Sequence, residues 1–300
     1  MMTKLDVGLI GYGEVGKIFS NGFKARGVNW VGAWDIVFGD ALFGGAQRLH
    51  AQAHGVIGCE SVGHLCGKAN LIISAVTASN TLSVAQEVAR SIRPGTVFLD
   101  LNSASPVTKL AASRCIEDAG AQYVEAAVMT AVQPYGIAVP MLLGGRHAAR
   151  LADRLRPHGL NLTPVSDKIG VASATKMARS IMIKGMEALV IESYATARKY
   201  GVEDAMLQTM QETFPGIDWN KQGAYFFSRA VQHGSRRAEE MRESANAVTE
   251  AGLTPLMATA IAEKHAWVAA LARQGVFSGI GKDAPWQEYA DRLLKARPTL

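Results

Sequence analysis

The sequence predicts a doubly wound α/β domain, followed by a long helix and an all-α domain. Three observations support this fold class. Short apolar runs alternate with helical patterns up to about residue 165, one helical pattern without proline covers 167–200, and only helical patterns follow it. A chain of 300 residues is also long enough for two domains.

Continuous apolar runs of strand length mark the first domain, and segments with helical spacing follow them. The runs are 5–10, 30–34, 71–76, 97–101 and 123–128. The helical segments include 15–25, 81–92 and 107–119, and further strands at 137–143 and 160–165 flank a helix at 146–156. Strands that are apolar on both faces and joined by helices indicate a parallel sheet covered on both sides.

The long helix is expected to start near Gly170, because apolar residues recur at helical spacing from there to Tyr200. The helical patterns beyond it lie at 203–213, 223–234, 236–251, 254–272 and 286–296. We therefore place the domain boundary between residues 167 and 168. The two domains are then 1–167 and 168–300, and the second is all-α.

Composition and charge limit the class of protein. Hydrophobic residues make up 48% of the chain and charged residues 19%, which excludes a disordered chain. The net charge of +5 comes without a long Lys/Arg block, so it fits an anionic small ligand and no nucleic acid is expected. Cys59, Cys66 and Cys115 indicate free thiols in a reducing compartment. Without a signal peptide or an apolar run near the ~20 residues of a membrane span, we expect a cytoplasmic protein that does not bind membranes.

A glycine motif lies between the first predicted strand and the first predicted helix. Its residues are Gly11, Tyr12, Gly13, Glu14, Val15 and Gly16. The first glycine allows a tight turn, the second lets the backbone approach a pyrophosphate, and the third lets helix and strand pack closely. The strand, turn and helix context predicts a Rossmann-like domain at 1–167 that binds a dinucleotide through these residues. The alternative is a glycine-rich turn with no ligand.

Asp35 ends the second predicted strand, about 20 residues beyond the motif, where such domains place an acceptor for the ribose 2′-hydroxyl. A carboxylate at this point repels a 2′-phosphate, and no arginine follows in 36–39. This pattern favours NAD, with NADP as the alternative cofactor. Asp35 could instead cap the next turn.

Two other strand ends are expected to line the ligand crevice, because ligands bind at the carboxyl ends of strands in an open parallel sheet. Val76 and Thr77 end one strand and are expected to pack against the ribose side of the cofactor. Asn102 and Ser103 follow the next strand and are expected to orient the substrate or the nicotinamide, with Ser103 on the cofactor. Ser105, before a proline, is read as a helix N-cap.

Four features of the sequence together resemble the β-hydroxyacid dehydrogenases, which include 3-hydroxyisobutyrate, tartronate-semialdehyde and 6-phosphogluconate dehydrogenases. They are the glycine motif, the sequence DLNSASP at 100–106, the run 125–145 ending in MLLGG, and a lysine in GVASATK at 170–176. The resemblance covers about the first 200 residues, and the second half is similar to a less characterised branch with a divergent C-terminal domain.

The resemblance implies reversible oxidation of a β-hydroxy acid with NAD(P), an interdomain helix and an all-α domain that builds a homodimer. It implies that Lys176 is the catalytic general acid/base. The family's substrate-binding Ser-Gly-Gly matches 129–131, where Thr130 supplies a hydroxyl, and its asparagine four residues after the lysine matches Ser180. The family's second lysine has no clear match, and Arg236 and Arg237 lie near its place.

These residues predict an NAD(P)-dependent oxidoreductase that transfers hydride between the nicotinamide and the carbinol carbon of a small anionic substrate. Lys176 is the expected general acid/base, and Thr130, Asn102 and Ser180 are expected to orient the substrate. One alternative is an imine reductase or aromatic-alcohol dehydrogenase on the same scaffold, although imine reducers tend to replace the lysine. The other is a non-catalytic dinucleotide sensor. Ser-His-Asp hydrolysis has no support, since no G-x-S-x-G motif is present.

Two further clusters are interpreted as structural. The first comprises His50, His54, Cys59, His64 and Cys66; it lacks zinc-site spacing, so we expect exposed histidines, buried thiols and no metal. The second comprises Trp219, Tyr225, Phe226 and Phe227, which are expected in the core, with a substrate pocket wall as the alternative. His233 is read as a satisfied helix-terminal histidine, with a second acid/base role as the alternative.

Overall fold

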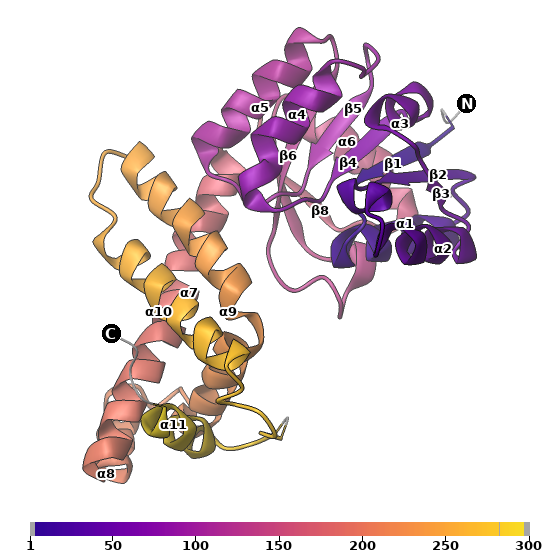
Figure 1. Cartoon of the computed structure of the whole chain (residues 1–300). Helices are drawn as coiled ribbons and strands as arrows, with labels where there is room; N and C mark the ends of the chain where they lie inside the picture. Colours follow the sequence, from indigo (N-terminus) through magenta and orange to yellow (C-terminus); the bar gives the residue numbers. More distant parts are fainter. Residues whose placement is uncertain (1–3, 282, 297–300) are drawn as a thin grey trace. The chain divides into compact units, whose positions relative to one another are not determined.

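An eight-stranded sheet organises the first part of the chain in the computed structural model, which describes residues 4–281 and 283–296 (Figure 1). The strand order is β3-β2-β1-β4-β5-β6-β7-β8. The strands are β1 Asp6–Ile10, β2 Trp30–Trp34, β3 Ile57–Gly58, β4 Leu71–Ser74, β5 Val97–Asp100, β6 Gln122–Val128, β7 Met141–Gly144 and β8 Leu162–Ser166. The order reverses between β1 and β4, so their carboxyl ends form the topological switch point at which such sheets bind ligands.

The sheet is parallel except for the pair β6 and β7, which is antiparallel. The predicted parallel sheet thus includes one antiparallel pair, which the sequence analysis did not predict. The connection between these strands, 129–140, contains only the short 3₁₀ helix η3 Gly136–Ala138. A parallel pair needs a crossover that is usually a helix, whereas an antiparallel pair can be joined by such a short loop.

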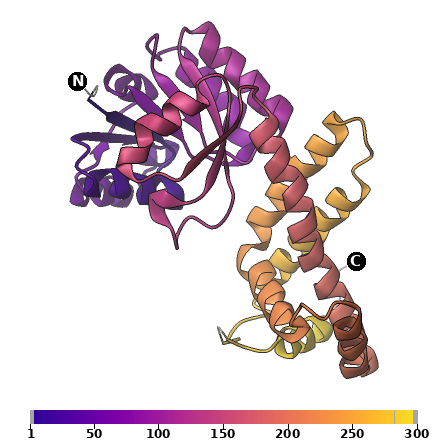
Figure 2. The same ribbon diagram turned by 180° about the vertical axis from the view of Figure 1, so that it is seen from behind.

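Helices cover both faces of the sheet, as the apolar strands predict. They are α1 Glu14–Ala25, α2 Gly44–Ala53, α3 Val62–Lys68, α4 Thr81–Ala89, α5 Pro106–Asp118 and α6 Ala148–Leu155. Alternate residues of β4 show the two layers: Leu71 and Ile73 pack in one buried cluster with α1 and α6, and Ile72 packs in the other with α3, α4 and α5. Helices α4 and α5 lie in front of the sheet in Figure 1, and α6 lies in front of it in Figure 2.

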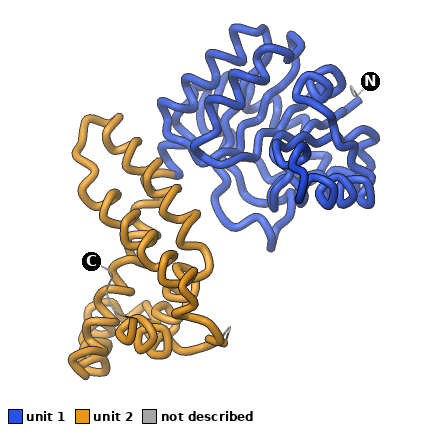
Figure 3. The backbone as a smooth tube through the Cα atoms, in the orientation of Figure 1, with its two compact units in different colours: residues 1–176 blue, residues 177–300 orange. Residues whose placement is uncertain are grey.

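The chain divides into two compact units, residues 1–176 and 177–300 (Figure 3). The division falls within the predicted long helix, α7 Val171–Tyr200. The second unit is helical, as predicted, and contains α8 Glu203–Thr213, α9 Trp219–Glu250, α10 Leu256–Arg273 and α11 Trp286–Lys295. In the described ranges, no helix is long and apolar enough to cross a membrane.

Helix α9 corrects the prediction of separate helices at 223–234 and 236–251. Gly234 does not end a helix; it lies buried in the middle of α9. A Cβ atom at this position would lie 2.8 Å from the carbonyl oxygen of His265 and 3.0 Å from the side chain of Ala269. The absence of a side chain at Gly234 therefore allows α9 to pack closely against α10.

The aromatic cluster of the second unit lies mostly in its core. Trp219, Phe226 and Phe227 are buried in a cluster formed by α7, α9, α10 and α11. Tyr225 departs from the expectation, because 54% of its surface is exposed. Tyr225 lies on the exposed side of α9, whereas the next two residues, Phe226 and Phe227, lie in the core.

Candidate functional site

The glycine turn joins β1 to α1 at the carboxyl edge of the sheet. Gly11 has a φ of +93°, and a Cβ atom there would lie 2.3 Å from the carbonyl oxygen of Ala75. A Cβ atom at Gly16 would lie 2.0 Å from the carbonyl oxygen of Gly11. Both positions therefore require glycine, the first for its conformation and for the approach of β4, and the second for helix-to-turn packing.

Gly13 differs from these two glycines, because a Cβ atom there would meet no described atom within 4 Å. Gly13 is the N-cap of α1 and is exposed together with Glu14. No side chain caps this helix end, so its first backbone N–H groups are directed outward. An uncapped helix N-terminus behind an open glycine backbone fits the pyrophosphate of a dinucleotide.

Asp35 lies between β2 and the 3₁₀ helix η1 Ile36–Gly39. Its Oδ2 accepts a hydrogen bond from the backbone N–H of Tyr12 at 2.6 Å, and its Oδ1 accepts one from Val37 at 2.9 Å. The carboxylate thus caps the next turn and also fastens the glycine turn to β2. Each carboxylate oxygen can accept more than one hydrogen bond, so a ribose hydroxyl can still bind to this half-buried group.

The side chain of Tyr12 is buried, so only its backbone is accessible at the glycine turn. Its ring is 2% exposed, packs edge-on against Phe38, and brings its hydroxyl 3.2 Å from Nδ1 of His50. Burial raises the pKa of the Tyr12 phenol. The sequence predicted Tyr12 as part of the cofactor motif but did not show that its side chain lies under η1 and α2.

Asn102 ties the ends of β4 and β5 together. Its Oδ1 accepts a hydrogen bond from the backbone N–H of Val76 at 2.7 Å, and its Nδ2 donates one to Ser74 Oγ at 3.0 Å. Asn102 is buried, whereas Val76 is half-buried and Thr77 is exposed after the strand end. The structure thus brings Asn102 and Val76 together at the switch-point edge, with the Asn102 side chain engaged in this link.

A buried ionic cluster that the sequence did not predict supports the same edge. Lys109 of α5 lies with its Nζ 2.8 Å from Oδ1 of Asp100, and Tyr123 donates a hydrogen bond to Oδ2 at 2.6 Å. Burial first, and then the charge of Asp100, raise the pKa of Tyr123 well above its usual value. Lys109 shares a buried helix face with Ala112, so its place in the helical pattern was a signal of burial.

Lys176 meets the carboxyl edge of the sheet through Ser103. Its Nζ donates a hydrogen bond to the Ser103 hydroxyl at 2.5 Å, and both side chains are half-buried. Two residues singled out separately, one after β5 and one in the second turn of α7, are therefore adjacent.

Glu125 of β6 positions the helix that carries Lys176. Its Oε1 accepts hydrogen bonds from the backbone N–H groups of Gly170 at 2.7 Å and Ala172 at 3.0 Å, and its Oε2 accepts one from the Ser173 hydroxyl at 2.9 Å. A Cβ atom at Gly144 would lie 2.3 Å from Oε1. Glu125 is fully buried, and its presence in an apolar strand was the signal that sequence reasoning missed.

Thr130 lies on the connection that follows β6 and is exposed. Ser105 occupies the N-cap position of α5 as predicted, and its Oγ accepts from the backbone N–H of Thr108 at 3.4 Å. Of the residues expected to contact the substrate, Thr130 is thus on the surface of the first unit and Asn102 in its interior.

In the second unit, Ser180 belongs to a buried group of charged residues. Its Oγ accepts a hydrogen bond from Nζ of Lys184 at 3.1 Å, and Nζ of Lys184 lies 3.0 Å from Oε2 of Glu240. Arg236, proposed as a replacement for the second lysine, is exposed, with its Nε 3.8 Å from Oε1 of Glu240.

The neighbouring charges of this group involve Glu187, Arg237 and His265. Arg237, the other proposed replacement, lies with Nη1 2.6 Å from Oε2 of Glu187, and His265 Nε2 donates to the backbone oxygen of Lys184 at 3.3 Å. Burial raises the pKa of Glu187 to about 7, although the charge of Arg237 opposes the shift. Burial lowers the pKa of His265 to about 4.

The histidine and cysteine segment shows no arrangement for a metal. No group of three or more metal-ligating side chains is found among residues 4–281 and 283–296. The rings of His50 and His54 stack at 4.2 Å, and Cys59 and Cys66 are buried, which raises the pKa of each thiol to about 11. His233 lies inside α9 and not at a helix end, so its interpretation as helix-terminal is wrong. It is half-buried, and burial lowers its pKa to about 4.

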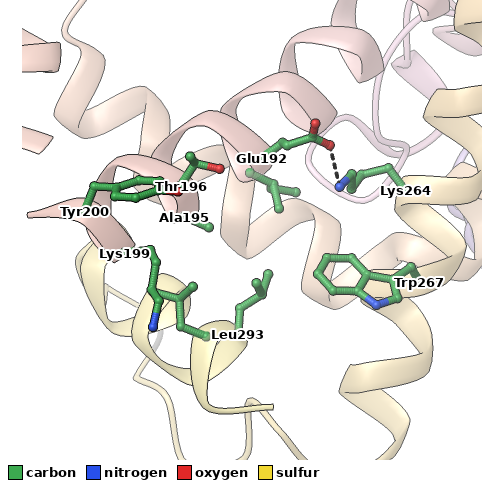
Figure 4. Close-up of a pocket in the computed structure, with 10 residues that line it drawn as sticks. Glu192, Ala195, Thr196, Lys199, Tyr200, Lys264, Trp267 and Leu293 are labelled. Atoms are coloured by element: carbon green, nitrogen blue, oxygen red, sulfur yellow. Dashed lines mark ion pairs between the residues drawn. The ribbon is translucent and has the colours of Figure 1, made fainter. Parts of the chain in front are cut away.

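A cavity of about 320 Å³ lies in the second unit between α7, α10 and α11 (Figure 4). Its lining includes Ala195, Trp267 and Leu293, and Lys264 is paired with Glu192 at 2.6 Å at its edge. None of its lining residues belongs to the predicted site. The glycine turn and the Lys176–Ser103 contact therefore remain the candidate functional site.

Two family models match the chain. The model described as the NAD binding domain of 6-phosphogluconate dehydrogenase matches residues 6–157, and a domain of unknown function, DUF1932, matches residues 197–268. The first match contains the glycine turn, Asp35 and the ends of β4 and β5.

Solved structures are similar to nearly the whole chain. A conserved hypothetical protein from Sinorhizobium meliloti 1021 is 36% identical, with a TM-score of 0.80 over 98% of this chain and 96% of that one. The conserved protein MTH1747, of unknown function, is 30% identical, with a TM-score of 0.71 over 90% and 98% of the two chains, and is described as similar to 3-hydroxyacid dehydrogenases. The 3-hydroxyisobutyrate dehydrogenase of Mycobacterium tuberculosis, solved with L-serine, is 19% identical with a TM-score of 0.73 over 99% and 100%, which shows a shared fold.

Proposed function

Since the chain belongs to the family defined by the NAD binding domain of 6-phosphogluconate dehydrogenase, we propose that it transfers hydride between NAD(P) and the carbinol carbon of a β-hydroxy acid or a related alcohol. The chain is a dinucleotide-dependent oxidoreductase of the 3-hydroxyacid dehydrogenase type. The observation that carries the finer proposal is the hydrogen bond between Lys176 and Ser103 at the carboxyl end of β5.

The first unit would hold the dinucleotide along its switch-point edge. The backbone of the Gly13 turn and the N-terminus of α1 would bind the pyrophosphate. Asp35 would accept a hydrogen bond from the ribose 2′-hydroxyl, Val76 and Thr77 would pack against the ribose side, and Ser103 would contact the nicotinamide end. Bound NAD(P) supplies the hydride acceptor or donor, at C4 of the nicotinamide.

Lys176 is the proposed general acid/base. During oxidation its neutral amine accepts the proton of the substrate hydroxyl while the C–H electron pair leaves with the hydride, and during reduction its ammonium returns the proton to the new alkoxide. Glu125 keeps the first turn of α7 in place, and Ser103 holds the amine of Lys176. Under this proposal, the proton acceptor is already held in position when the substrate binds.

Thr130 and Ser180 are the proposed substrate-orienting residues, because both carry a hydroxyl at a position that matches the family's substrate residues. Asn102, whose amide links Val76 and Ser74, would act by holding the ends of β4 and β5 in place. We also propose a homodimer in the cytoplasm and an anionic substrate, which the net charge of +5 supports.

The test of catalysis compares Lys176→Ala with wild type on a panel of hydroxy acids, aromatic alcohols and cyclic imines with NAD(H) and NADP(H). We expect kcat to fall by about 10²- to 10⁴-fold while the Kd of NADH stays within about twofold. Lys199→Ala, near the end of the same helix, is the matched control and should behave as wild type. If the wild type turns over no compound of the panel and still binds NADH, the protein is a dinucleotide sensor.

Cofactor choice gives a second test of the same proposal. The Asp35 carboxylate lies where it would face the 2′-position, so a 2′-phosphate would meet a like charge. We expect the Kd of NADH to be about tenfold or more below that of NADPH in fluorescence titration. Equal affinities, or tighter binding of NADPH, would show that Asp35 serves only as the cap of η1.

A further inference from the structure

The cavity of the second unit is large enough for a small molecule. It measures about 320 Å³, and all of its lining residues belong to α7, α10 and α11 of this unit (Figure 4). Liquid water takes about 30 Å³ per molecule, so roughly ten non-hydrogen atoms fit into this volume. Ligand pockets measure about 300–1,000 Å³, and the cavity therefore lies at the lower end of their range.

The walls of the cavity are mostly apolar. Ile191 and Ala195 of α7 are buried, and Trp267 of α10 and Leu293 of α11 pack, partly buried, against the same hydrophobic cluster. The Trp267 ring extends toward Leu293 in Figure 4. The apolar body of a ligand would displace water from these walls, which favours binding.

Trp267 offers a hydrogen-bond donor that the other tryptophans of this unit do not. Nε1 of Trp219 donates to the backbone oxygen of Met210 at 3.1 Å. Nε1 of Trp286 donates to Oδ1 of Asn220, also at 3.1 Å. Among the residues that the structure describes, no acceptor is found for Nε1 of Trp267. This donor at the cavity wall is therefore available to a ligand.

Thr196 adds a hydroxyl to the same cavity. The Thr209 and Thr213 hydroxyls donate to backbone carbonyls of their own helix at 2.8 and 3.0 Å, as helical threonines often do. Within the described part of the chain, no such hydrogen bond is found for Thr196. Thr196 and Lys199 both line the cavity and are three residues apart on α7, so a hydroxyl and an ammonium group lie on the same side of this helix.

The charged residues of the lining favour an anion. Nζ of Lys264 lies 2.6 Å from Oε2 of Glu192, whereas no ion pair of Lys199 is found in the ranges 4–281 and 283–296. Two lysines and one glutamate give the lining a net charge of +1. Lys264 also lies over the Trp267 ring, 5.0 Å from its centroid, so the cation–π contact that a cationic ligand could make there is already formed.

We propose that this cavity binds a small organic anion, an aryl or alkyl monocarboxylate of roughly ten non-hydrogen atoms. Its apolar body contacts Ile191, Leu293 and the Trp267 ring, and its carboxylate lies beside Lys199 and the uncharged donors. A carboxylate forms charge-assisted hydrogen bonds with such groups, whereas a neutral amide forms weaker ones. None of these residues takes part in the proposed hydride transfer, so the inference goes beyond the proposed function.

The test measures the binding of probes to the whole chain by saturation-transfer NMR titration. Phenylacetate, phenylacetamide and phenethylamine share a benzyl group and are anionic, neutral and cationic at neutral pH. We expect a Kd of about 0.1–1 mM for phenylacetate and one about tenfold higher for phenylacetamide. Phenethylamine should show no saturable binding.

A bulky substitution shows whether the probe occupies this cavity. Leu293→Trp fills part of the volume and should raise the Kd of phenylacetate by about tenfold or more, because the probe and the indole ring cannot share the same space. Leu253→Trp is the matched control. It makes the same change at an exposed position between α9 and α10, outside the lining, and should keep the Kd within about twofold.

Two variants of the Glu192–Lys264 pair change the charge in opposite directions. Glu192→Gln makes the lining more positive and should lower the Kd of phenylacetate by about threefold, and Lys264→Met makes it neutral and should raise the Kd by about threefold. Glu212→Gln, at an exposed position of α8 outside the lining, is the matched control and should leave the Kd unchanged. General damage to the fold would weaken binding in both variants, so opposite signs identify an effect of charge.

Several results would overturn the inference. Equal Kd values for phenylacetate and phenylacetamide would remove the role of the charge, and equal Kd values for Leu293→Trp and Leu253→Trp would place the probe elsewhere. If the wild type does not bind phenylacetate and Leu293→Trp lowers the mass found by analytical ultracentrifugation, a second copy of the chain covers this face. The variants of Glu192 and Lys264 remain informative if Leu293→Trp fails to fold.

Discussion

The two units each bury an ionic cluster, and the clusters differ in how fully their charges are bonded. In the first unit, the Asp100 carboxylate forms an ion pair with Lys109 and accepts hydrogen bonds from the Tyr123 hydroxyl and the backbone N–H of Asn102, all at 2.6–2.9 Å. In the second unit, Glu187 faces Arg237 at 2.6 Å but has His265 only at 3.7 Å. A buried charge with several bonds is fixed in place, whereas one with few bonds changes its protonation state more readily.

This difference has a functional meaning. The Asp100 cluster lies beneath the strand end that carries Asn102 and Ser103, so it acts as a rigid support for the proposed site. The Glu187 cluster surrounds Lys184, and burial raises the pKa of Glu187 to about 7. We therefore expect Glu187 to change its protonation state near neutral pH.

The largest expected effect is the loss of Lys109. Lys109→Met would leave the Asp100 carboxylate buried without its cation, which costs about 3–5 kcal/mol of the free energy of unfolding. Urea unfolding, with hydrogen exchange of the β5 and β6 peptides, would measure it. Lys264→Met is the matched control, with an expected change below about 1 kcal/mol, because the Glu192 side chain that it would leave unpaired is exposed to water. Equal losses of unfolding free energy in the two variants would contradict the distinction between the buried Lys109–Asp100 pair and the more exposed Lys264–Glu192 pair.

A smaller effect is expected for Arg237→Met in the second unit. Glu187 loses its cation, but its pKa of about 7 lets it take up a proton at little cost. We expect a loss of about 1–2 kcal/mol at pH 6 and a larger one at pH 8, because only at the higher pH does the wild-type protein gain from a charged Glu187 paired with Arg237. Urea unfolding at both pH values checks this. A loss that does not depend on pH, or that matches Lys109→Met, would contradict the distinction between the clusters.

The sequence predicted the features that adjacent residues encode. The strand, glycine turn and helix of the dinucleotide site occupy one short segment, and the period of the apolar residues defines the strands and helix α7. The missed features depend on partners far apart in the chain. Glu125 caps a helix 45 residues away, and Lys184 meets Glu240 on another helix. Gly234 was read as a helix end because its reason, the approach of α10, cannot be seen from its neighbours in the sequence.

The smallest effect concerns how stability changes with pH. Glu187 has a folded pKa of about 7 against an ordinary value of 4.5, so the stability it contributes is present below pH 4.5 and is lost as pH rises to about 7. His265 and His233 have folded pKa values of about 4 against 6.5, so their contribution is present above pH 6.5 and is lost as pH falls to about 4. The two trends oppose each other between pH 4.5 and 6.5.

Glu187→Gln removes one of these trends and leaves the other. Between pH 4.5 and 6.5, the urea concentration at the midpoint of unfolding should then rise more steeply in the variant than in wild type. Between pH 6.5 and 7.5, the decrease in this midpoint that Glu187 causes in wild type should be absent from the variant. Glu192→Gln, at an exposed position on the same helix, should keep the wild-type profile. Parallel profiles for Glu187→Gln and wild type would mean that Glu187 is held charged by Arg237 throughout, and the second cluster would then be as rigid as the first.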